Sequence, residues 1–550
     1  MKWQYLSDEQ IDDEKELLKT IISNRNISDL EQFFNSPDPT SISITDFGVD
    51  QQQLTKAITR IKAAISNQEK VLIYGDYDAD GITATSILWL TLNQLGLIAE
   101  PFIPDRLKHG YGISIKALEE IFAKKKPDLV ITVDNGIVAH EPLEWLKNQE
   151  VDVIVTDHHQ PAKKSVISLA TVHSTLISGG AVAWVLAREL SAKFASSLLD
   201  LVAISTVADQ MPLLGVNRSL VKFGLNSLRS NNRAGVMALF NVSGVKVSNV
   251  SVGTIGFTIA PRLNAAGRLT QGLVAMRLLC TDDPSSAQRI ARNLNQLNQE
   301  RQALTSEQLL EAVRQAKDQA DENLLFIAAP SFHEGVIGLL AGRLTEKYFK
   351  PSIVVATEGK TSKASARSVS GVNITQLIRT VDDELLSVGG HELAAGFSAQ
   401  TNQIESIKQR LLTLARNQID PKLLEPNLKV DALIGQSLLN KNTVSLLKKL
   451  QPYGLGNSEP VIAVHNISLV DYKLIGSDNE HLKLALKSEN DSSIIEAVGW
   501  RMGAMSTSLK KLNSKQLLDI ACCLEINSWN GKESLQLRLK DFKKSTFADS

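Results

Sequence analysis

Three short apolar segments, each followed by acidic residues, constrain the fold of this chain more than any other feature. They are VLIYG (71–75), LVITV (129–133) and VDVIVT (151–156). Short, largely apolar runs of this length are typical of parallel strands that are buried on both faces. Helical apolar spacing lies between them, and strands that alternate with helices indicate βαβ units. The sequence therefore predicts an α/β fold around a parallel sheet.

The remaining sequence predicts further domains, because 550 residues are too many for one hydrophobic core and suggest about three or four domains. After Pro284, an apolar pattern without Gly or Pro predicts one long helix. LLFIAA (324–329) opens a second α/β lobe, and later short strands with turns predict a small β-barrel. The expected domains are a helical segment (1–50), a first α/β domain (51–281), a connector helix (282–320), a second α/β domain (321–420) and a β-barrel (428–545).

The composition is that of a soluble globular protein. A hydrophobic fraction of 43%, a charged fraction of 22% and a mean hydropathy of −0.05 exclude a disordered chain, a fibrous repeat and a coiled-coil rod. No stretch approaches the roughly 18 apolar residues of a membrane span. The acidic start lacks a signal-peptide apolar region, so we expect a cytoplasmic protein. Three cysteines provide neither a disulfide framework nor a cysteine zinc site.

Charge alone does not indicate a nucleic-acid-binding protein. The formal net charge is −1, from 59 basic and 60 acidic residues. Any binding to nucleic acid must therefore depend on individually placed residues rather than on an overall basic field.

The acidic residues after the three apolar segments are expected to meet at one edge of the sheet. The residues concerned are Asp76, Asp78 and Asp80 after the first segment, Asp134 after the second, Asp157, His158 and His159 after the third, and Asp209 at the end of a predicted buried helix. The carboxyl ends of the strands in an open α/β sheet are where ligands bind.

Carboxylates gathered in one crevice repel one another, and a divalent cation relieves this repulsion. Oxygen ligands with one or two imidazoles suit Mn²⁺ or Mg²⁺ better than zinc. Four or more carboxylates can hold two ions about 3.5–4 Å apart, which activate water and stabilise a phosphoryl group under in-line attack. Any single cluster is more typical of a turn or a helix cap. Three such clusters at successive strand ends, one of which contains Asp-His-His, favour a metal site.

DYDADG, VDNG, TDHH and VADQMP, in this order, resemble the four motifs of the DHH phosphoesterase superfamily. Downstream, PRLNAAGRL (261–269), FHEGVIGLLAGRL (332–344), SARS (365–368) and GGHELAAG (389–396) resemble one branch, the RecJ single-strand-specific exonucleases. The resemblance covers about residues 40–545. It implies a DHH domain and a DHH-associated domain with the active site in the groove between them, and a C-terminal OB-fold that grips single-stranded DNA.

The resemblance also implies an activity. It is the 5′→3′ removal of nucleotides from single-stranded DNA as 5′-mononucleotides, with two Mn²⁺ or Mg²⁺ ions, in DNA recombination and repair. A helicase and a single-strand-binding protein are the implied partners, and we expect a monomer.

Residue roles follow from motif position within the family. The implied metal ligands are Asp78, Asp80, Asp134, His158 and Asp209. Asp76 and His159 would lie close to the ions or to the scissile phosphate. The residues implied to hold the terminal 5′ phosphate are Arg106, Arg268, Ser365, Arg367, Gly389, Gly390 and His391. Arginine binds phosphate bidentately and glycine permits close backbone approach. A pocket for the 5′ end explains exonuclease rather than endonuclease action.

Several interpretations stay open at this point. His333 either caps the helix after it or contacts substrate. In the barrel, core packing competes with base stacking for Tyr453, Tyr472, Trp500, Trp529 and Phe542. A solvated face competes with DNA-backbone contact for Lys448, Lys449, Lys510, Lys511, Lys543 and Lys544.

Two other functions compete with the exonuclease. The first is a different DHH phosphoesterase, acting on oligoribonucleotides or small nucleotides; the predicted barrel and connector argue against it. The second is a non-catalytic single-strand DNA-binding scaffold, and the complete set of acidic motifs argues against that.

Overall fold

The chain forms two compact units, as seen in a computed structural model. The barrel unit comprises Met1–Pro37, Pro212–Arg218 and Pro426–Ser550, and the two-lobed unit comprises Asp38–Met211 and Ser219–Glu425. The structure describes residues 1–27, 29–110, 112–230, 233–488, 493–509, 517–529 and 531–545. Among these residues, no helix combines the length and the apolar character needed to cross a bilayer.

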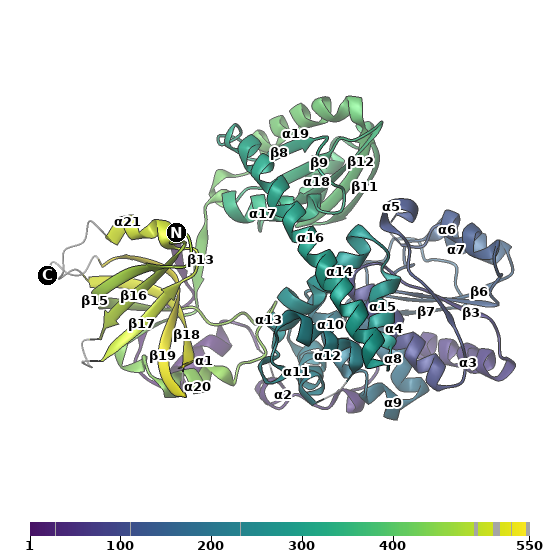
Figure 1. Ribbon diagram of the computed structural model, residues 1–550, viewed down its shortest axis with the longest axis horizontal. Coiled ribbons are helices and arrows are strands. Elements are labelled where there is room, and N and C mark those ends of the chain that lie inside the picture. Colours follow the sequence, from purple (N-terminus) through teal and green to yellow (C-terminus); the bar gives the residue numbers. More distant parts are fainter. Residues whose placement is uncertain are drawn as a thin grey trace. The chain divides into compact units, whose positions relative to one another are not determined.

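The first lobe of the two-lobed unit contains the predicted parallel sheet (Figure 1). Its strands are β3 (Val71–Tyr74), β4 (Glu100–Phe102), β5 (Leu129–Val133), β6 (Asp152–Asp157) and β7 (Ala170–His173). They pair in parallel in the order β4-β3-β5-β6-β7. The chain moves outward from β3 to β4 and returns to β5 on the other side of β3. This reversal creates a switch point between β3 and β5, where open α/β sheets bind ligands.

Helices cover both faces of this sheet. Helices α6 (Ile115–Phe122) and α7 (His140–Asn148) pack on one face, and α4 (Ala79–Gln94) and α8 (Gly179–Leu190) pack on the other. Helix α10 (Leu199–Ala208) packs against both α4 and α8. These three helices are apolar and buried on nearly all sides, as expected of helices inside a large lobe. The other α-helices described between residues 38 and 281 are α3 (Gln51–Asn67), α5 (Arg106–His109), α9 (Ala192–Ser196), α11 (Gly215–Ser230), α12 (Ala234–Ser243), α13 (Val252–Thr254), α14 (Ala260–Leu269) and α15 (Leu273–Cys280).

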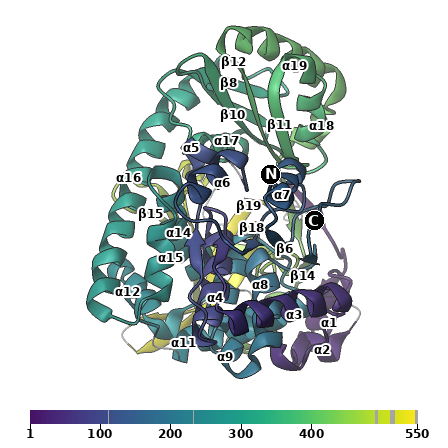
Figure 2. The same ribbon diagram turned by 90° about the vertical axis from the view of Figure 1, so that its right-hand side faces the viewer.

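A single long helix, α16 (Pro284–Lys317), connects the two lobes and is prominent in Figure 2. Asp283 caps it by accepting hydrogen bonds from the backbone N–H groups of Ser285 and Ser286, and Pro284 occupies its first turn. Its 34 residues correspond to about 50 Å of helix. It packs on α12, α14 and α15 of the first lobe and on α17 (Ile337–Tyr348) of the second.

The second lobe is a five-stranded mixed sheet between two helical layers. Strands β8 (Leu325–Ala329) and β9 (Ser352–Ala356) pair in parallel, and β10 (Thr361–Arg367), β12 (Ala394–Gln400) and β11 (Leu385–His391) extend the sheet in antiparallel fashion. Helices α16 and α17 bury one face of the sheet. Helices α18 (Ile374–Arg379) and α19 (Ile404–Gln418) bury the other face.

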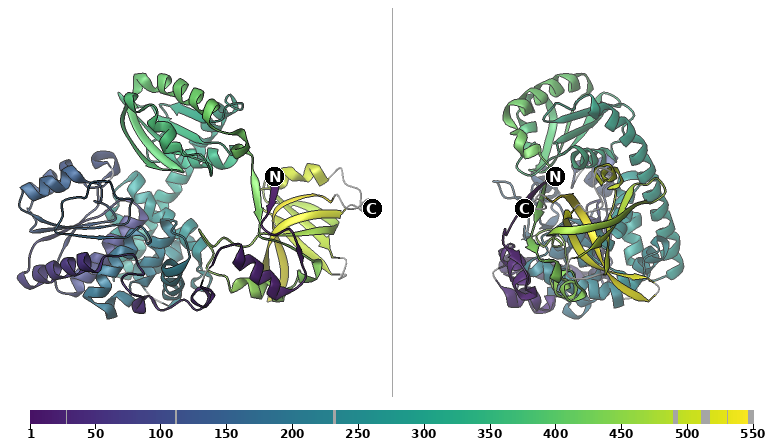
Figure 3. Two further views of the ribbon diagram at one scale, coloured as in Figure 1. Left: turned by 180° about the vertical axis from the view of Figure 1, so that it is seen from behind. Right: turned by 90° about the vertical axis from the view of Figure 1, so that its left-hand side faces the viewer.

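The barrel unit contains a closed β-barrel, as the sequence predicts (Figure 3). Its strands are β15 (Ile462–Ile475), β16 (His481–Lys487), β17 (Ile494–Gly499), β18 (Leu517–Trp529) and β19 (Lys532–Lys544). Pairing of β15 with β16 closes the barrel. Strand β14 (Ala432–Ile434) extends the sheet beyond β15, and α20 (Lys441–Lys448) contacts β18. Three of these strands are 13 or 14 residues long, so the expected short strands are longer than predicted.

The first fifty residues are not only helical, and the prediction of a helical segment there needs correction. Strand β1 (Lys2–Tyr5) pairs in parallel with β13 (Asn427–Val430), and β2 (Gln10–Ile11) pairs with β14. Helix α1 (Glu14–Ser23) then contributes apolar residues to the barrel core, and α2 (Leu30–Phe34) follows. Strands of four and two residues are too short to show a periodic pattern, and their partners lie more than 400 positions away.

Candidate metal centre and phosphate pocket

The DYDADG segment turns from β3 into α4 at the switch point. Asp78 is the N-cap of α4, and its carboxylate accepts a hydrogen bond from the Gly81 N–H at 3.0 Å. A Cβ at Gly81 would lie 2.6 Å from the Asp76 Cβ, so only glycine fits this position. The tight turn places Asp76 and Asp78 outside the end of β3 and Asp80 in the first turn of α4.

The N-terminus of α8 holds the buried Asp80 carboxylate. Its Oδ2 accepts a hydrogen bond from the Gly179 N–H at 2.8 Å, and its Oδ1 accepts one from the Gly180 N–H at 2.8 Å. The Ser205 hydroxyl on α10 also donates to Oδ1. Free N–H groups and the helix dipole at a helix N-terminus stabilise an anion. The Asp80 side chain is therefore held in one fixed orientation.

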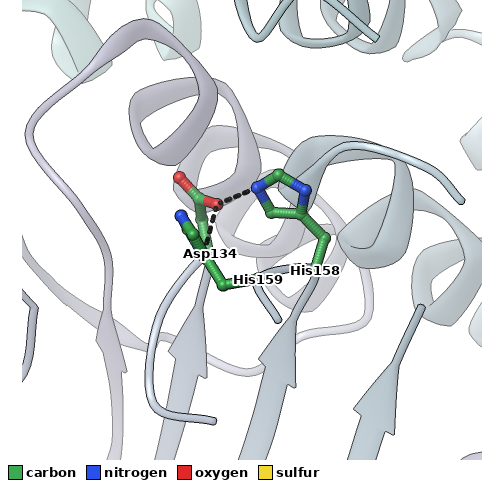
Figure 4. Close-up of side chains that lie close together, drawn as sticks. All are labelled: Asp134, His158 and His159. Atoms are coloured by element: carbon green, nitrogen blue, oxygen red, sulfur yellow. Dashed lines mark ion pairs between the residues drawn. The ribbon is translucent and has the colours of Figure 1, made fainter. Parts of the chain in front are cut away.

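Asp134 and the two histidines after β6 converge on one point (Figure 4). His158 Nε2 lies 3.2 Å from Asp134 Oδ1, and His159 Nδ1 lies 4.0 Å from the same oxygen. His158 Nε2 is also 3.7 Å from Asp80 Oδ2, and its Nδ1 is 3.6 Å from Asp209 Oδ2. Asp209 directly follows α10, as the sequence predicts. His158 therefore lies among carboxylates from three different elements.

Asp157 orients the histidine pair. Its Oδ1 accepts hydrogen bonds from the backbone N–H groups of His158 at 2.7 Å and His159 at 3.1 Å, and from His159 Nδ1 at 2.8 Å. Its Oδ2 accepts one from the Ile137 N–H at 2.9 Å. Because Nδ1 of His159 donates to Asp157, this hydrogen bond fixes the orientation of the imidazole ring.

The pKa values at the site show how the two histidines differ. Burial lowers the pKa of His159. The hydrogen bond to Asp157 and the charge of Asp157 outweigh this effect and raise the pKa to about 9. Burial lowers the pKa of His158 and this effect prevails, so its imidazole tends to be neutral, as a metal ligand must be.

The carboxylates of the site are poorly compensated by the protein alone. Burial, followed by the charge of Asp78, raises the pKa of Asp76 well above its usual range. Burial and the charge of Asp80 do the same for Asp134, and they raise the pKa of Asp209 to about 8. A cation bound among these groups would reverse the shifts.

The residues present fit a divalent ion. Asp76 Oδ1 and Asp134 Oδ1 are buried and accept no hydrogen bond from any described residue, which is costly unless another partner binds them. Three sets of side chains each bring their possible metal-ligand atoms within 4.8 Å of one another. The first set is Asp76, Asp78 and Asp134, the second is Asp134, His158 and His159, and the third is Asp80, His158 and Asp209. Hard oxygen donors with imidazole are the ligands that Mn²⁺ and Mg²⁺ accept.

Three of the predicted phosphate-binding arginines lie near one another between the lobes of the two-lobed unit. Arg268, in the last turn of α14, donates from Nη1 to the Gly335 carbonyl at 2.9 Å. Arg106 lies over the Tyr77 ring, 5.6 Å from its centroid. Burial, and then the charge of Arg106, lowers the pKa of Arg367. Burial also lowers the pKa of Arg268, and the charges of Arg106, Arg301 and Arg367 add to this effect and bring it to about 10. A cavity of about 400 Å³ is lined by Arg106 and Arg268.

The second lobe aligns the other predicted phosphate-binding residues. On β10, Arg367 Nη1 donates to Ser365 Oγ at 3.4 Å. Through β12, the register places Gly389 in line with Ser365 and His391 in line with Arg367. Residues in one register row share a face of the sheet, so His391 and Arg367 point to the same face. A Cβ at Gly389 would meet nothing within 4 Å, which leaves its backbone open to a ligand. Gly390 has a φ of +143°, a conformation that needs glycine.

His333 stabilises the turn before α17. Its Nδ1 accepts a hydrogen bond from the Gly335 N–H at 3.0 Å, and its backbone N–H donates to Gln308 on α16. The N-cap of α17 itself is Val336, which provides no side-chain hydrogen bond. Of the two alternatives for His333, the contacts support a local structural role, and substrate contact stays a prediction.

The barrel aromatics divide between core and surface. Phe542 is buried in the barrel core, while Tyr453 is partly buried and donates to the Leu447 carbonyl. Trp500 is 56% exposed and packs edge-on against His481. Lys543 lies over the Trp3 ring, and Lys510 and Lys511 fall outside the described residues.

The sequence analysis missed the groups that support the acidic residues. Gly179 and Gly180 bind Asp80 through their backbone, and a Cβ at Gly179 would lie 2.4 Å from Asp134 Oδ1. Two glycines directly after a capping serine at the start of an apolar helix were the available signal. The role of Asp157 as an anchor could not be distinguished in sequence from that of a ligand.

Family models match all three parts of the chain. The DHH family N-terminal domain matches residues 70–206, the DHHA1 domain matches residues 321–417 and the RecJ OB domain matches residues 430–541.

Individual relatives extend this similarity to most of the chain. The single-stranded-DNA-specific exonuclease RecJ of Bacillus subtilis is 34% identical over 90% of this chain, which spans 63% of that relative's length. The Haemophilus influenzae RecJ is 30% identical, with 89% of this chain and 90% of the relative covered. RecJ of Thermus thermophilus superposes with a TM-score of 0.82 as its Mn²⁺ complex, at 29% identity, covering 99% of this chain and 79% of that one. Its Mg²⁺ complex gives 0.77 at 28% identity, covering 99% and 78%. The predicted resemblance is thus confirmed: the chain belongs to the RecJ family of DHH proteins.

Proposed function

We propose that this chain is a metal-dependent exonuclease that degrades single-stranded DNA from the 5′ end and releases 5′-mononucleotides. The observation that carries the proposal is the convergence of acidic and histidine side chains at the switch point, where two buried carboxylate oxygens accept no hydrogen bond from the part of the chain that the structure describes. Relatives named as single-stranded-DNA-specific exonucleases support the choice of substrate.

The ligands we assign are Asp78, Asp80, Asp134, His158 and Asp209, with Asp76 and His159 beside them. When bound, two Mn²⁺ or Mg²⁺ ions would supply an activated water and neutralise charge on the phosphoryl oxygens. The protein keeps the ligands in place beforehand. The α8 N-terminus holds Asp80, and Asp157 fixes the loop that carries both histidines. His159, with its proton on Nδ1 shared with Asp157, can face the scissile phosphate.

Polarity would come from the arginine pocket. The charge of Arg106 lowers the pKa values of Arg268 and Arg367, and the charge of Arg367 also lowers that of Arg268, so an anion between them would relieve this repulsion. A terminal 5′ phosphate is such an anion, and Ser365, Gly389, Gly390 and His391 line the same end of the second-lobe sheet. Holding the terminal phosphate there would limit how far the strand reaches into the metal site, which favours removal of one nucleotide at a time.

A cleavage assay with Mn²⁺ tests the proposal, using one single-stranded oligonucleotide labelled at the 5′ end and the same oligonucleotide labelled at the 3′ end. We expect immediate release of a labelled mononucleotide from the 5′ label, a slowly shortening ladder from the 3′ label, and no cutting of blunt duplex. Binding without cleavage under any divalent ion would instead favour a scaffold. Cleavage restricted to dinucleotides or short oligoribonucleotides would favour another DHH phosphoesterase.

Single-strand binding by the barrel unit is part of the proposal, supported by the match to the RecJ OB domain. Association with a helicase and a single-strand-binding protein, the monomeric state and the cytoplasmic location stay predictions from the family resemblance.

A further inference from the structure

Phe257 is the most exposed of the large hydrophobic side chains in the described part of the chain, with 86% of its surface accessible. It lies in η3 (Ile255–Ile259), a π-helical turn between α13 and α14. Its neighbours Ile255 and Ile259 are buried, so the turn itself is packed while the Phe257 ring projects from it. Single exposed apolar residues are common on protein surfaces, but an exposed aromatic ring beside basic side chains is also a surface on which a base can stack.

The local sequence accounts for the π turn. Pro261 has no N–H, so the carbonyl of Phe257 lacks the donor four residues later that an α-helix would supply. The Ala260 N–H instead reaches back five residues to the Ile255 carbonyl. One extra residue in a turn offsets the side chains before it from those after it, and such turns occur frequently at functional sites.

The position of the turn relates Phe257 to the metal centre. A Cβ at Gly256 would lie 3.8 Å from Val207 Cγ1, so η3 packs directly on α10 two residues before Asp209. On the other side, α14 carries Asn264, whose Oδ1 accepts a hydrogen bond from the Ala79 N–H at the start of α4. The Phe257 turn therefore packs on the helix that precedes Asp209 and leads into α14, whose Asn264 binds the start of the helix that carries Asp80.

One arginine contacts this turn, and two more lie on α16 and α17. Arg262 Nη1 donates to the Thr258 carbonyl at 2.7 Å, and its Nε donates to Asn295 on α16 at 3.1 Å. Further along α16, Arg301 has a buried Nε that finds no hydrogen-bond partner among the described residues. Arg343 on α17 is half exposed and forms an ion pair with Glu346 at 3.4 Å.

The charges of Arg343 and Arg262 act on Arg301. Burial, and then these two charges, lowers the pKa of Arg301. Arg301 in turn lowers the pKa of Arg268, which links it to the arginine pocket around the proposed 5′ phosphate site. A phosphate bound at Arg301 would relieve this repulsion.

We propose that Phe257, together with Arg262 and Arg301, forms a strand-selecting surface: one unpaired base stacks on the Phe257 ring and the adjacent phosphates bind the guanidiniums. Exposed aromatic rings beside basic side chains are how proteins hold single-stranded nucleic acid. A base can stack on a side chain only after it leaves the duplex, so the surface would favour a single strand next to the metal centre. This inference rests on the proposed function. It adds Phe257, which lies outside the quoted sequence motifs, and two arginines to which the sequence analysis assigned no role.

The test measures binding without cleavage, in EDTA, to a short 5′-phosphorylated oligonucleotide that carries 2-aminopurine at successive positions. When 2-aminopurine occupies the position that stacks on Phe257, we expect the unaltered protein to quench its fluorescence. The Phe257→Ala protein should not quench it. The Kd should rise about 10-fold for Phe257→Ala and stay within about twofold for Phe257→Trp, because stacking on an aromatic ring is what is lost or retained. Phe257→Leu should behave like Phe257→Ala.

Ile98→Ala is the matched control. Ile98 is 84% exposed in the same unit but precedes β4, at the amino-terminal edge of the sheet, away from the metal centre. It should change neither quenching nor Kd. In a separate arm, Arg301→Gln should lower the slope of log Kd against log salt by about one, as expected for one lost phosphate contact.

Unchanged quenching and Kd in Phe257→Ala would overturn the inference, as would a Phe257→Leu variant that binds like the unaltered protein. These outcomes are separable from the proposed function. A protein that binds the strand through Phe257 but does not cleave it with Mn²⁺ refutes the exonuclease proposal alone. A protein that cleaves normally after Phe257→Ala, with unchanged binding, refutes the stacking surface alone.

Discussion

Asp134 combines burial, a raised pKa and a carboxylate oxygen without a hydrogen bond. In the absence of metal, its negative charge should therefore oppose folding at neutral pH, and a bound cation should reverse that effect. We expect Asp134→Asn to leave the metal-free Tm unchanged or higher, to abolish the rise in Tm on adding Mn²⁺, and to lower cleavage at least 100-fold. Thermal unfolding of EDTA-treated protein, with and without Mn²⁺, measures the first two effects.

Asp382→Asn is the control for this substitution, because it removes the same charge from an exposed position in the same unit. It should retain the full response to Mn²⁺. An Asp134→Asn protein that is still stabilised by Mn²⁺ to the normal extent would exclude Asp134 from the ligand set.

Gly179 is required by two contacts at once. Its N–H binds Asp80, and a Cβ there would lie 2.4 Å from Asp134 Oδ1, far inside van der Waals contact. We expect Gly179→Ala to displace the Asp134 carboxylate and to remove both cleavage and Mn²⁺-dependent stabilisation. Gly253→Ala, which meets nothing closer than 3.6 Å, should be tolerated. Normal activity in Gly179→Ala would mean that Asp134 can move without loss of function.

At the scale of secondary-structure elements, the buried strands could be predicted because their chemistry is local. Strands β3, β5 and β6 are apolar runs that end in acidic residues, and the parallel sheet brings those ends together whatever the loops do. Elements held by distant partners could not be predicted. Strand β1 depends on β13, and the π turn at Phe257 depends on one proline within an otherwise helical pattern. The same applies to Asp157, whose role is set by the Ile137 N–H from another loop.

Strand β10 and helix α17 together form the wall that carries Arg367. A Cβ at Gly338 of α17 would lie 3.0 Å from Ser365 Oγ and 3.5 Å from Arg367 Nη2, so the helix packs closely on both side chains. Because a charge-assisted hydrogen bond contributes about 1.5–3 kcal/mol, Arg367→Ala should lower kcat/KM on 5′-phosphorylated ends by about 10- to 100-fold. Oligonucleotides with a 5′ hydroxyl should be affected much less. Arg379→Ala, an exposed arginine on α18, is the control. An equal loss on both kinds of end would remove Arg367 from the phosphate pocket.

At the scale of the whole molecule, the metal centre and the barrel belong to parts with separate hydrophobic cores. The metal centre lies in the two-lobed unit, and the barrel packs its own core with residues from both ends of the chain. The chain passes between the units after Pro37, Met211, Arg218 and Glu425. Substitutions in one core should therefore leave the fold of the other unit intact.

This separation predicts that Asp80→Ala and His158→Ala abolish hydrolysis while single-stranded DNA binding stays mostly intact. Both side chains belong to the metal centre, and neither contributes to the barrel core. Electrophoretic mobility shifts in EDTA, compared with cleavage in Mn²⁺ on a long oligonucleotide, separate the two activities. If binding fell in parallel with cleavage, the barrel could not be an independent holder of the strand. The metal centre would then itself contribute most of the affinity, and the division of labour between the units would have to be abandoned.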